Sequence, residues 1–361
     1  MISVQRKALA MDTRTMLRIF RTLSIFLLVV GLWVSQSVQA QDEPKKTVAF
    51  VTNQIASFWN IAEVGCQDAA EDFDINVDVR FPDEATATQQ KQIVEDLLAS
   101  GIDALAITPL DAENQQQAIN NWCNKIPVIT HDSDAPETER LMYIGMDNYL
   151  AGRLLGKLIK DEYPDGCNLI ISVGRLEQDN SRKRRQGVID ELLGREPDAT
   201  RFDEIDDEIE GNGFTIYATI TDQGKPEVAK QKVEDAINAY DDVELFVGLF
   251  AYNPPACLQG IRQSNMVGKI KVAAFDEADQ TLQGIKEGAV IGTVVQDPYE
   301  YGYQSVRILS ELLKGNNEVI PESKFIDIVA RAVTKTERDI DGTESLNVDD
   351  FWSDLRDKTG Q

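Results

Sequence analysis

The stretch GIDALAITP, residues 101–109, sets the fold class of this chain. Its centre, residues 104–108, is an apolar run of the length of a buried strand, and a glycine and a proline bound it. Residues 88–100 before it and 112–122 after it repeat apolar side chains at helical spacing. A strand that is apolar on both faces and lies between two helices is typical of a parallel sheet.

The same alternation continues along most of the chain. Predicted strands cover residues 47–52, 77–81, 104–108, 127–130, 141–144, 168–173, 215–219, 244–249, 271–275 and 291–296. Predicted helices cover residues 59–73, 88–100, 112–122, 150–160, 182–193, 227–240, 255–264, 280–287 and 299–313. Because about eleven strands are too many for one compact sheet in a chain of this length, we expect an α/β protein with two Rossmann-like domains, each a parallel sheet with helices on both faces.

The first forty residues do not follow this pattern. They open with five basic residues against one acidic residue, continue through a nearly apolar run at 23–34 (LSIFLLVVGLWV), and end with Val38 and Ala40 at a cleavage point. This order is typical of a secretory signal peptide over residues 1–40. A membrane anchor is the alternative, but a twelve-residue helix spans about 18 Å, short of the roughly 30 Å hydrocarbon core. We therefore expect export to the periplasm.

The chain after the predicted leader is strongly acidic, with 31 Lys+Arg against 60 Asp+Glu and a net charge of −29. Such a surface repels nucleic acid and anionic membranes. The acidic stretch 203–210 (DEIDDEIE) matches no calcium-binding motif and is interpreted as a solvated surface loop. Residues 341–361 have weak periodicity and are interpreted as a tail that docks loosely or frays.

The sequence offers little material for catalysis. Its one histidine, His131, lies beside aspartates in residues 130–134, too close in sequence to assemble a catalytic triad. No Gly-x-Ser-x-Gly, Walker A or Gly-x-Gly-x-x-Gly motif follows any predicted strand. We therefore predict a protein that is not an enzyme and needs no cofactor or metal. A glycosidase that uses Asp132 and Asp276 as its two carboxylates is the enzymatic alternative.

The cysteines do not indicate a disulfide framework. There are four of them and none forms a C-x-x-C pair, so free thiols are expected. The four residues are Cys66, Cys123, Cys167 and Cys257.

Polar and aromatic side chains gather at the carboxyl ends of the predicted strands, where ligands bind in open parallel sheets. An aromatic ring packs against the C–H face of a sugar, and carboxylate, amide and guanidinium groups satisfy its hydroxyls. Taken singly, each residue could instead belong to the core or cap a helix. The candidate ligand-binding residues are Phe58, Trp59, Asp132, Arg182, Asn253, Asp276 and Gln296.

In this order and spacing, these segments resemble the ribose/galactose class of periplasmic sugar-binding proteins, the type I binding proteins of ABC transporters. The resemblance runs from about residue 47 to 338. It rests on AFVT (49–52), SFW (57–59), GIDALAITP (101–109), IPVITHD (126–132), YIGMDN (143–148), VAAFD (272–276) and GTVVQ (292–296).

The resemblance implies two lobes joined by a three-segment hinge, with the ligand between the lobes. The chain would cross between lobes near residues 146–147, 296–297 and 327–328. An N-terminal lobe would then comprise residues 47–146 and 297–327. A C-terminal lobe would comprise residues 147–296 and 328–340.

The resemblance also implies roles for the candidate residues. Phe58 and Trp59 would stack on the sugar, and Asp132, Arg182, Asn253, Asp276 and Gln296 would bond its hydroxyls.

Three positions depart from the ribose-binding pattern. Ala56 stands where an asparagine is usual, Ser133 where an arginine is usual and Gly224 where an aromatic residue is usual. Losing a cation and a ring predicts a roomier and more acidic pocket, to which Asp134 and Asp222 would contribute. We therefore expect a bulkier sugar, an amino sugar or a polyol in place of ribose.

The function implied is capture of a sugar or a similar polyhydroxylated molecule by hinge closure, followed by delivery to an ABC permease in the membrane. The protein would act as a monomer. One alternative is a ligand-sensing partner of a chemoreceptor or histidine kinase. Another is a lactose-repressor-type regulator, but that class needs a basic helix-turn-helix before the first strand, where this chain has an apolar run.

Overall fold

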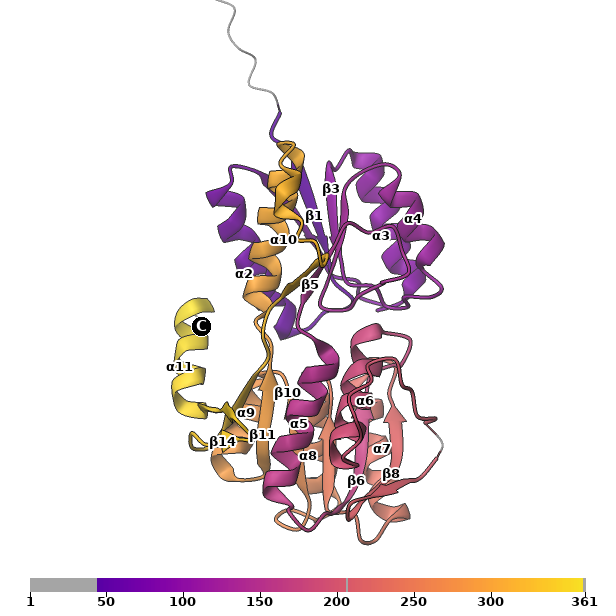
Figure 1. The fold of residues 1–361 in the computed structure, drawn as a ribbon, viewed down its shortest axis with the longest axis vertical. Helices are drawn as coiled ribbons and strands as arrows, with labels where there is room; N and C mark the ends of the chain where they lie inside the picture. The colour runs from indigo at the N-terminus through magenta and orange to yellow at the C-terminus, as the bar shows by residue number, and fades with distance from the viewer. Residues whose placement is uncertain (1–43, 206, 360–361) are drawn as a thin grey trace, which may run out of the picture. The chain divides into compact units, whose positions relative to one another are not determined.

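The computed structural model describes residues 44–205 and 207–359, so the predicted leader at residues 1–40 lies outside the described residues. Strands and helices alternate from residue 47 to 313. They build two sheets whose central strands are parallel and whose faces are covered by helices (Figure 1). The predicted α/β fold class is therefore confirmed. Within the described part of the chain, every helix is too short or too polar to span a bilayer.

The first sheet has six strands, all parallel, in the order β12-β5-β4-β3-β1-β2. Its strands are β1 (Thr47–Val51), β2 (Asn76–Arg80), β3 (Ala104–Ile107), β4 (Val128–His131), β5 (Tyr143–Gly145) and β12 (Phe325–Asp327). Helices α2 (Ser57–Asp72) and α10 (Pro298–Leu313) cover one face, and α3 (Ala87–Ser100) and α4 (Gln116–Cys123) cover the other (Figure 1). We call this sheet and its helices, with the short helix η1 (Asn317–Val319), the N-lobe.

The second sheet has eight strands in the order β16-β13-β11-β10-β9-β6-β8-β7. They are β6 (Asn168–Val173), β7 (Ile209–Gly211), β8 (Phe214–Thr221), β9 (Leu245–Gly248), β10 (Lys271–Phe275), β11 (Val290–Val295), β13 (Arg331–Thr334) and β16 (Leu346–Asn347). Two pairings, β7 with β8 and β11 with β13, are antiparallel. The sequence predicts only parallel pairing because it does not reveal β7 or β13.

Helices also cover both faces of the second sheet. On one face lie α5 (Asn148–Glu162) and α6 (Asp179–Leu192). The other face carries α7 (Pro226–Ala239), α8 (Asn253–Gln263), α9 (Asp279–Glu287) and α11 (Val348–Thr359). A two-stranded ribbon of β14 (Asp339–Ile340) and β15 (Thr343–Glu344) is separate from this sheet. We call this group of elements the C-lobe.

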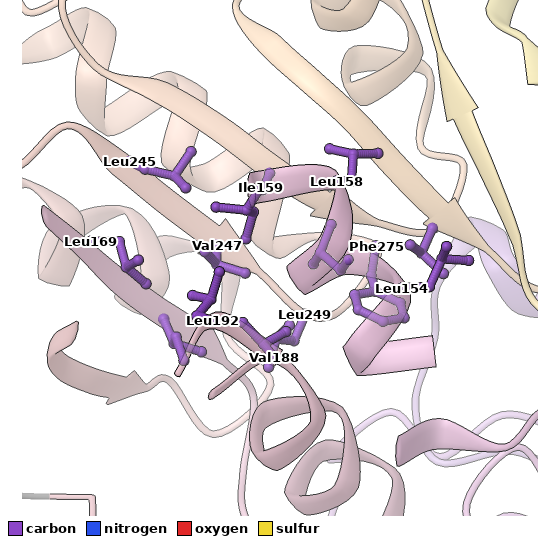
Figure 2. Packing of buried hydrophobic residues seen from close by; sticks show 14 of the residues in the cluster. Leu154, Leu158, Ile159, Leu169, Val188, Leu192, Leu245, Val247, Leu249 and Phe275 are labelled. Carbon is purple, nitrogen blue, oxygen red and sulfur yellow. The ribbon is translucent and has the colours of Figure 1, made fainter. Parts of the chain in front are cut away.

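The core of the C-lobe follows from the helical spacing of its apolar residues. On α5, Leu154 and Leu158 are one turn apart and face the sheet, and on α6 Val188 and Leu192 do the same (Figure 2). They pack on strand residues such as Val247 of β9, which is fully buried. A strand buried on both faces needs apolar side chains throughout, which explains the uninterrupted apolar runs in the sequence.

The chain crosses between the lobes three times: after β5, after β11 and between β12 and β13. The first two crossings each lead into a helix that an aspartate caps. Asp147 Oδ1 accepts a hydrogen bond from Leu150 N at 2.9 Å at the start of α5. Asp297 Oδ1 accepts one from Glu300 N at 3.3 Å at the start of α10. These caps satisfy backbone donors that a helix start otherwise leaves unpaired.

The C-terminal segment is docked, contrary to the loose tail that we predicted. Val348 and Phe351 of α11 are buried in the core beneath the second sheet. Trp352 Nε1 donates to Asp279 Oδ1 of α9 at 3.0 Å, and Lys358 Nζ lies 3.1 Å from Asp297 Oδ2. The periodicity was weak because only two side chains of this helix are buried.

The acidic stretch 203–210 is only partly a solvated loop. Asp203 Oδ2 lies 2.6 Å from Arg195 Nη1 and accepts a hydrogen bond from Gln186 Nε2 at 2.6 Å. Ile209 is buried in β7. The first and last parts of the stretch are therefore tied to the C-lobe, and Glu204, Asp207 and Glu208 are exposed.

All four cysteines are free in the structure. Cys66, Cys167 and Cys257 are buried, and Cys123 is half-buried. Burial raises the pKa of the buried Cys257 thiol to about 12, which keeps it protonated and unreactive.

Candidate functional site

The carboxyl ends of strands from both lobes surround one pocket, which we call the inner pocket. It is lined by aromatic rings, carboxylates, amides and a single guanidinium. The lining residues are Asn53, Gln54, Ala56, Phe58, Trp59, Asp132, Asn180, Arg184, Phe250, Ala251, Asp276 and Gln296.

Aromatic side chains reach the inner pocket from both lobes. Phe58 and Trp59 belong to the first turn of α2, and their ring centroids are 4.8 Å apart in an edge-on arrangement. Trp59 Nε1 donates to Asn53 Oδ1 at 2.8 Å, which fixes the indole ring. Phe250, just after β9, brings a third ring from the C-lobe. Such rings can pack against the C–H faces of a sugar.

His131 stands behind these rings and not in the inner pocket. Its ring stacks on Phe50 with centroids 4.0 Å apart and meets the edge of Trp59 at 5.5 Å. Complete burial lowers the pKa of His131 to about 3, so the imidazole is neutral. It supports the aromatic wall as an uncharged packing residue.

Asp132 and Asp276 occupy equivalent places in the two lobes. Asp132 directly follows β4 and Asp276 directly follows β10, and both adopt the left-handed backbone conformation, with φ of 57° and 66°. This conformation is uncommon for residues other than glycine and costs about 1 kcal/mol or more. It turns each carboxylate into the inner pocket at the end of its strand.

Both carboxylates accept hydrogen bonds from neutral groups. Asp132 Oδ2 accepts from Thr108 Oγ1 at 3.2 Å and, across the lobes, from Asn180 Nδ2 at 3.1 Å. Asp276 Oδ1 accepts from Gln296 Nε2 at 2.6 Å, and Gln296 Oε1 in turn accepts from the Tyr301 hydroxyl at 2.7 Å. The orientation of Gln296 is therefore set by Tyr301.

Arg184 lies between the two aspartates. Its Nη2 is 3.6 Å from Asp132 Oδ1 and its Nη1 is 3.9 Å from Asp276 Oδ2. Its hydrogen bonds go elsewhere, from Nε to Asn148 Oδ1 at 2.9 Å and from Nη1 to Leu249 O at 3.0 Å. One guanidinium is thus shared by two carboxylates and makes a close pair with neither.

Burial governs the protonation of these acids. It raises the pKa of Asp132 to about 6, while the Arg184 guanidinium acts in the opposite direction and Asp276 adds to the rise. Burial also raises the pKa of Asp276, with Arg184 and Gln296 opposing it.

Five of the predicted ligand-binding residues line the inner pocket: Phe58, Trp59, Asp132, Asp276 and Gln296. Arg182 does not, because it is exposed on the outer side of α6, where its guanidinium lies 5.1 Å from the centre of the Phe202 ring. The prediction for Arg182 is therefore corrected, and Arg184 occupies the place intended for it.

Asn253 and Asp134 lie close by without lining the inner pocket. Asn253 Oδ1 accepts from Phe250 N at 3.0 Å and its Nδ2 donates to Asp222 Oδ2 at 2.8 Å, so its hydrogen bonds hold the turn that carries Phe250. Asp134 forms a two-pronged ion pair with Arg140, which neutralises its charge.

Seven lining residues were not among the predicted ligand-binding residues, although sequence signals existed for two of them. Asn180 and Arg184 are four residues apart on α6, in line with the buried Val188, so helical periodicity points both of them inward. Arg182 is two residues from Arg184 and falls on the opposite side of the helix. No pattern distinguished Asn53, Gln54 or Phe250 from ordinary loop residues.

This fold and this pocket define a two-lobed α/β protein with a buried polar and aromatic binding site between its lobes. A model of the periplasmic binding protein domain matches residues 48–317. The chain therefore belongs to this family, and its resemblance to the ribose/galactose class is confirmed.

Two curated relatives are ribose import binding proteins named RbsB. The one from Salmonella typhimurium is 24% identical over 292 residues, which cover 80% of this chain and 92% of the relative. The one from Escherichia coli is 25% identical over 293 residues, with the same shares covered.

Solved structures with the same fold include GanP, a glucose-galactose binding protein from Geobacillus stearothermophilus. It is 23% identical with a TM-score of 0.72, covering 81% of this chain and 98% of GanP. A solute-binding protein from Burkholderia graminis, solved with D-arabinose, is 25% identical with a TM-score of 0.71, covering 81% and 97%.

Proposed function

We propose that this protein captures a sugar or a similar polyhydroxylated small molecule in the inner pocket and delivers it to an ABC importer. The observation that carries the proposal is the composition of this pocket. Three aromatic rings surround two carboxylates, a guanidinium and several amides, and both lobes contribute. Rings recognise the C–H faces of a sugar, and the mixed acceptors and donors satisfy hydroxyls that act as both.

The relatives support this proposal. The curated relatives that match over most of their length include ribose import binding proteins, and one solved neighbour holds D-arabinose. We also propose that this chain binds its ligand without converting it chemically. Both lobes line the inner pocket, so a bound ligand would draw the lobes together.

The test is a binding screen of the purified protein against ribose, allose, xylose, arabinose, glucose, galactose, amino sugars and polyols. A ligand at about one hundred times its dissociation constant should stabilise the fold by roughly 2.7 kcal/mol and raise the melting temperature. Asp276→Asn should weaken the binding, while Glu287→Gln, an exposed change on α9, should leave it intact. If no compound in the screen shifts the melting temperature, the proposed function is wrong.

We further propose that residues 1–40 direct export and are removed, and that the mature monomer meets a membrane permease in the periplasm. Mass measurement of the secreted protein should give a chain starting near Gln41. Deleting the membrane permease that this protein serves should abolish uptake of the bound sugar. If uptake persists and a chemotactic or kinase response is lost when this protein is deleted, the sensing alternative replaces transport.

A further inference from the structure

The groups around the inner pocket carry an excess of negative charge. Asp132 and Asp276 line the pocket. Glu277 follows Asp276 in the chain, and Asp222 accepts a hydrogen bond from Asn253, which holds the turn that carries Phe250. All four are at most 5% exposed. Among the described residues that line the pocket, Arg184 is the one cationic side chain. Arg184 is thus shared by the two carboxyls that line the pocket, and the two further buried carboxyls add acidic groups nearby.

Arg184 cannot neutralise even the two nearest acids. It lies 3.6 Å from one and 3.9 Å from the other, and two of its nitrogens donate to Asn148 and Leu249 O. A close two-pronged pair with one carboxylate would be shorter and stronger.

The remaining partners of these carboxyls are neutral. Asp222 accepts hydrogen bonds from Tyr252 and Asn253, and neither carboxyl oxygen of Glu277 has a hydrogen-bond partner within the part of the chain that the structure describes. Arg331 acts on Glu277 only from an exposed position, with 44% of its side chain accessible. Arg175 donates to the carbonyl oxygens of Ala85 and Gln223 at the edge of the cleft.

Two other buried acids of this protein are neutralised by nearby cationic side chains. Asp134 is paired with Arg140, and Glu191 lies 2.7 Å from Arg153 Nη2 and from Lys160 Nζ. The chain thus neutralises buried acids elsewhere and leaves the acids of the inner pocket without a matching cation. A buried carboxylate without a cation costs free energy that a bound positive charge would recover.

A second observation indicates that the inner pocket is built to take a polar group. Arg184 Nη2 and Asn180 Oδ1 are buried atoms without a hydrogen-bond partner among residues 44–205 and 207–359, and both residues line the pocket. A donor and an acceptor are therefore available within the charged region. The rings of Phe58, Trp59 and Phe250 add faces that attract a cation.

We propose that the ligand is an amino sugar, or another polyhydroxylated molecule with a protonated amine, and that its ammonium group binds on the pocket side of Asp132 and Asp276, beside Arg184. This inference rests on the proposed sugar-binding function and narrows its ligand class. Burial raises the pKa of all four acids, as expected of carboxyls that lack a cation.

Calorimetric titration of the purified protein with matched sets of sugars tests this inference. The members of each set share the same stereochemistry. Each set contains a hexose, its amino-deoxy form and its N-acetylated form, in the gluco, galacto and manno series, with the amine at carbon 2, 3 or 6. The N-acetyl group places a neutral nitrogen where the ammonium would be. We expect one amine to bind at least about tenfold tighter than both neutral members of its set.

Two variants show whether charge causes this preference. Asp132→Asn keeps the shape of the side chain, removes the charge of a carboxylate that lines the pocket, and should reduce the ratio of amine to neutral affinity severalfold. Glu191→Gln removes the same charge from a compensated site and should leave that ratio unchanged. If the hexose binds as tightly as its amine in every set, the amine inference is overturned and sugar binding stands. If no sugar of any kind binds, both proposals fail.

Discussion

Arg182 and Arg184 are separated by one residue on α6 and have opposite environments. Arg184 is 1% exposed beside Asp132 and Asp276, whereas Arg182 is exposed beside Phe202. Arg184→Gln should weaken binding of the ligand about 10- to 100-fold, because a charge-assisted donor is lost from a buried site. Arg182→Gln is the matched control and should bind normally in the same calorimetric titration. Equal losses in both variants would contradict the placement of the site.

The raised pKa of Asp132 makes a prediction about stability and pH. A carboxyl whose pKa is about 6 when folded and near 3.9 when unfolded binds its proton more tightly in the folded state. Its contribution to stability is therefore present below pH 4 and lost as the pH rises through 6. In urea unfolding of the ligand-free protein, the free energy of unfolding of Asp132→Asn relative to the wild type should increase between pH 4 and 6, by up to about 3 kcal/mol. If the difference in unfolding free energy between the variant and the wild type stays constant from pH 4 to 6, the raised pKa of Asp132 is wrong.

At the residue scale, the sequence predicted the parts of the site that follow strand ends. Asp132, Asp276 and Gln296 each follow or end a strand, and the topology brings strand ends together. Choosing between Arg182 and Arg184 requires knowing which side of the helix faces the pocket. The run of basic residues from 182 to 185 obscured this helical periodicity. Phe250 could not be predicted because a loop aromatic carries no periodicity.

Among the elements, α2 and α10 pack so closely that their contact needs glycine on both helices. A Cβ atom at Gly302 would overlap the carbonyl oxygen of Ala62, and one at Gly65 would overlap that of Tyr299. Gly302→Ala gains about 1 kcal/mol of helix propensity but forces the helices apart, so we expect a net loss of about 1–3 kcal/mol in urea unfolding. Gln67→Ala, at an exposed position of α2, should be neutral or slightly stabilising. If Gly302→Ala is as harmless as Gln67→Ala, the close contact between α2 and α10 is wrong.

The sequence predicted the long elements and missed the short ones for one reason. A helix such as α5 contains enough residues to show a period, whereas β7 and β12 to β16 contain two to four residues each. Some of these short strands exist because a strand distant in sequence pairs with them, as β13 pairs with β11 and β12 with β5, whereas β7 and β14 pair with the strand that follows them. Such pairing is decided by the folded sheet and not by the local sequence.

For the whole molecule, the proposed function predicts that the lobes move together around the ligand. A compact chain of this length has a radius of gyration of about 20 Å, and separated lobes exceed that value. Small-angle scattering should therefore show a decrease towards this value when the ligand saturates the protein. Asp132 and Asn180 already join the lobes through a hydrogen bond. Asn180→Ala should therefore shift the equilibrium towards separated lobes, with a larger radius of gyration. Unchanged dimensions at saturation would rule out closure.

The three crossings between the lobes also determine when each lobe can be completed during synthesis. The N-lobe needs α10 and β12, which end at Asp327, and these come after nearly all of the C-lobe. The C-lobe in turn waits for β13, β16 and α11. The N-lobe can be completed only after Asp327 has been made and the C-lobe only after α11, so a nascent chain stays incomplete until its last few dozen residues emerge. The same interleaving means that cutting the gene at any single point between the first and last of these elements splits at least one lobe between the two fragments.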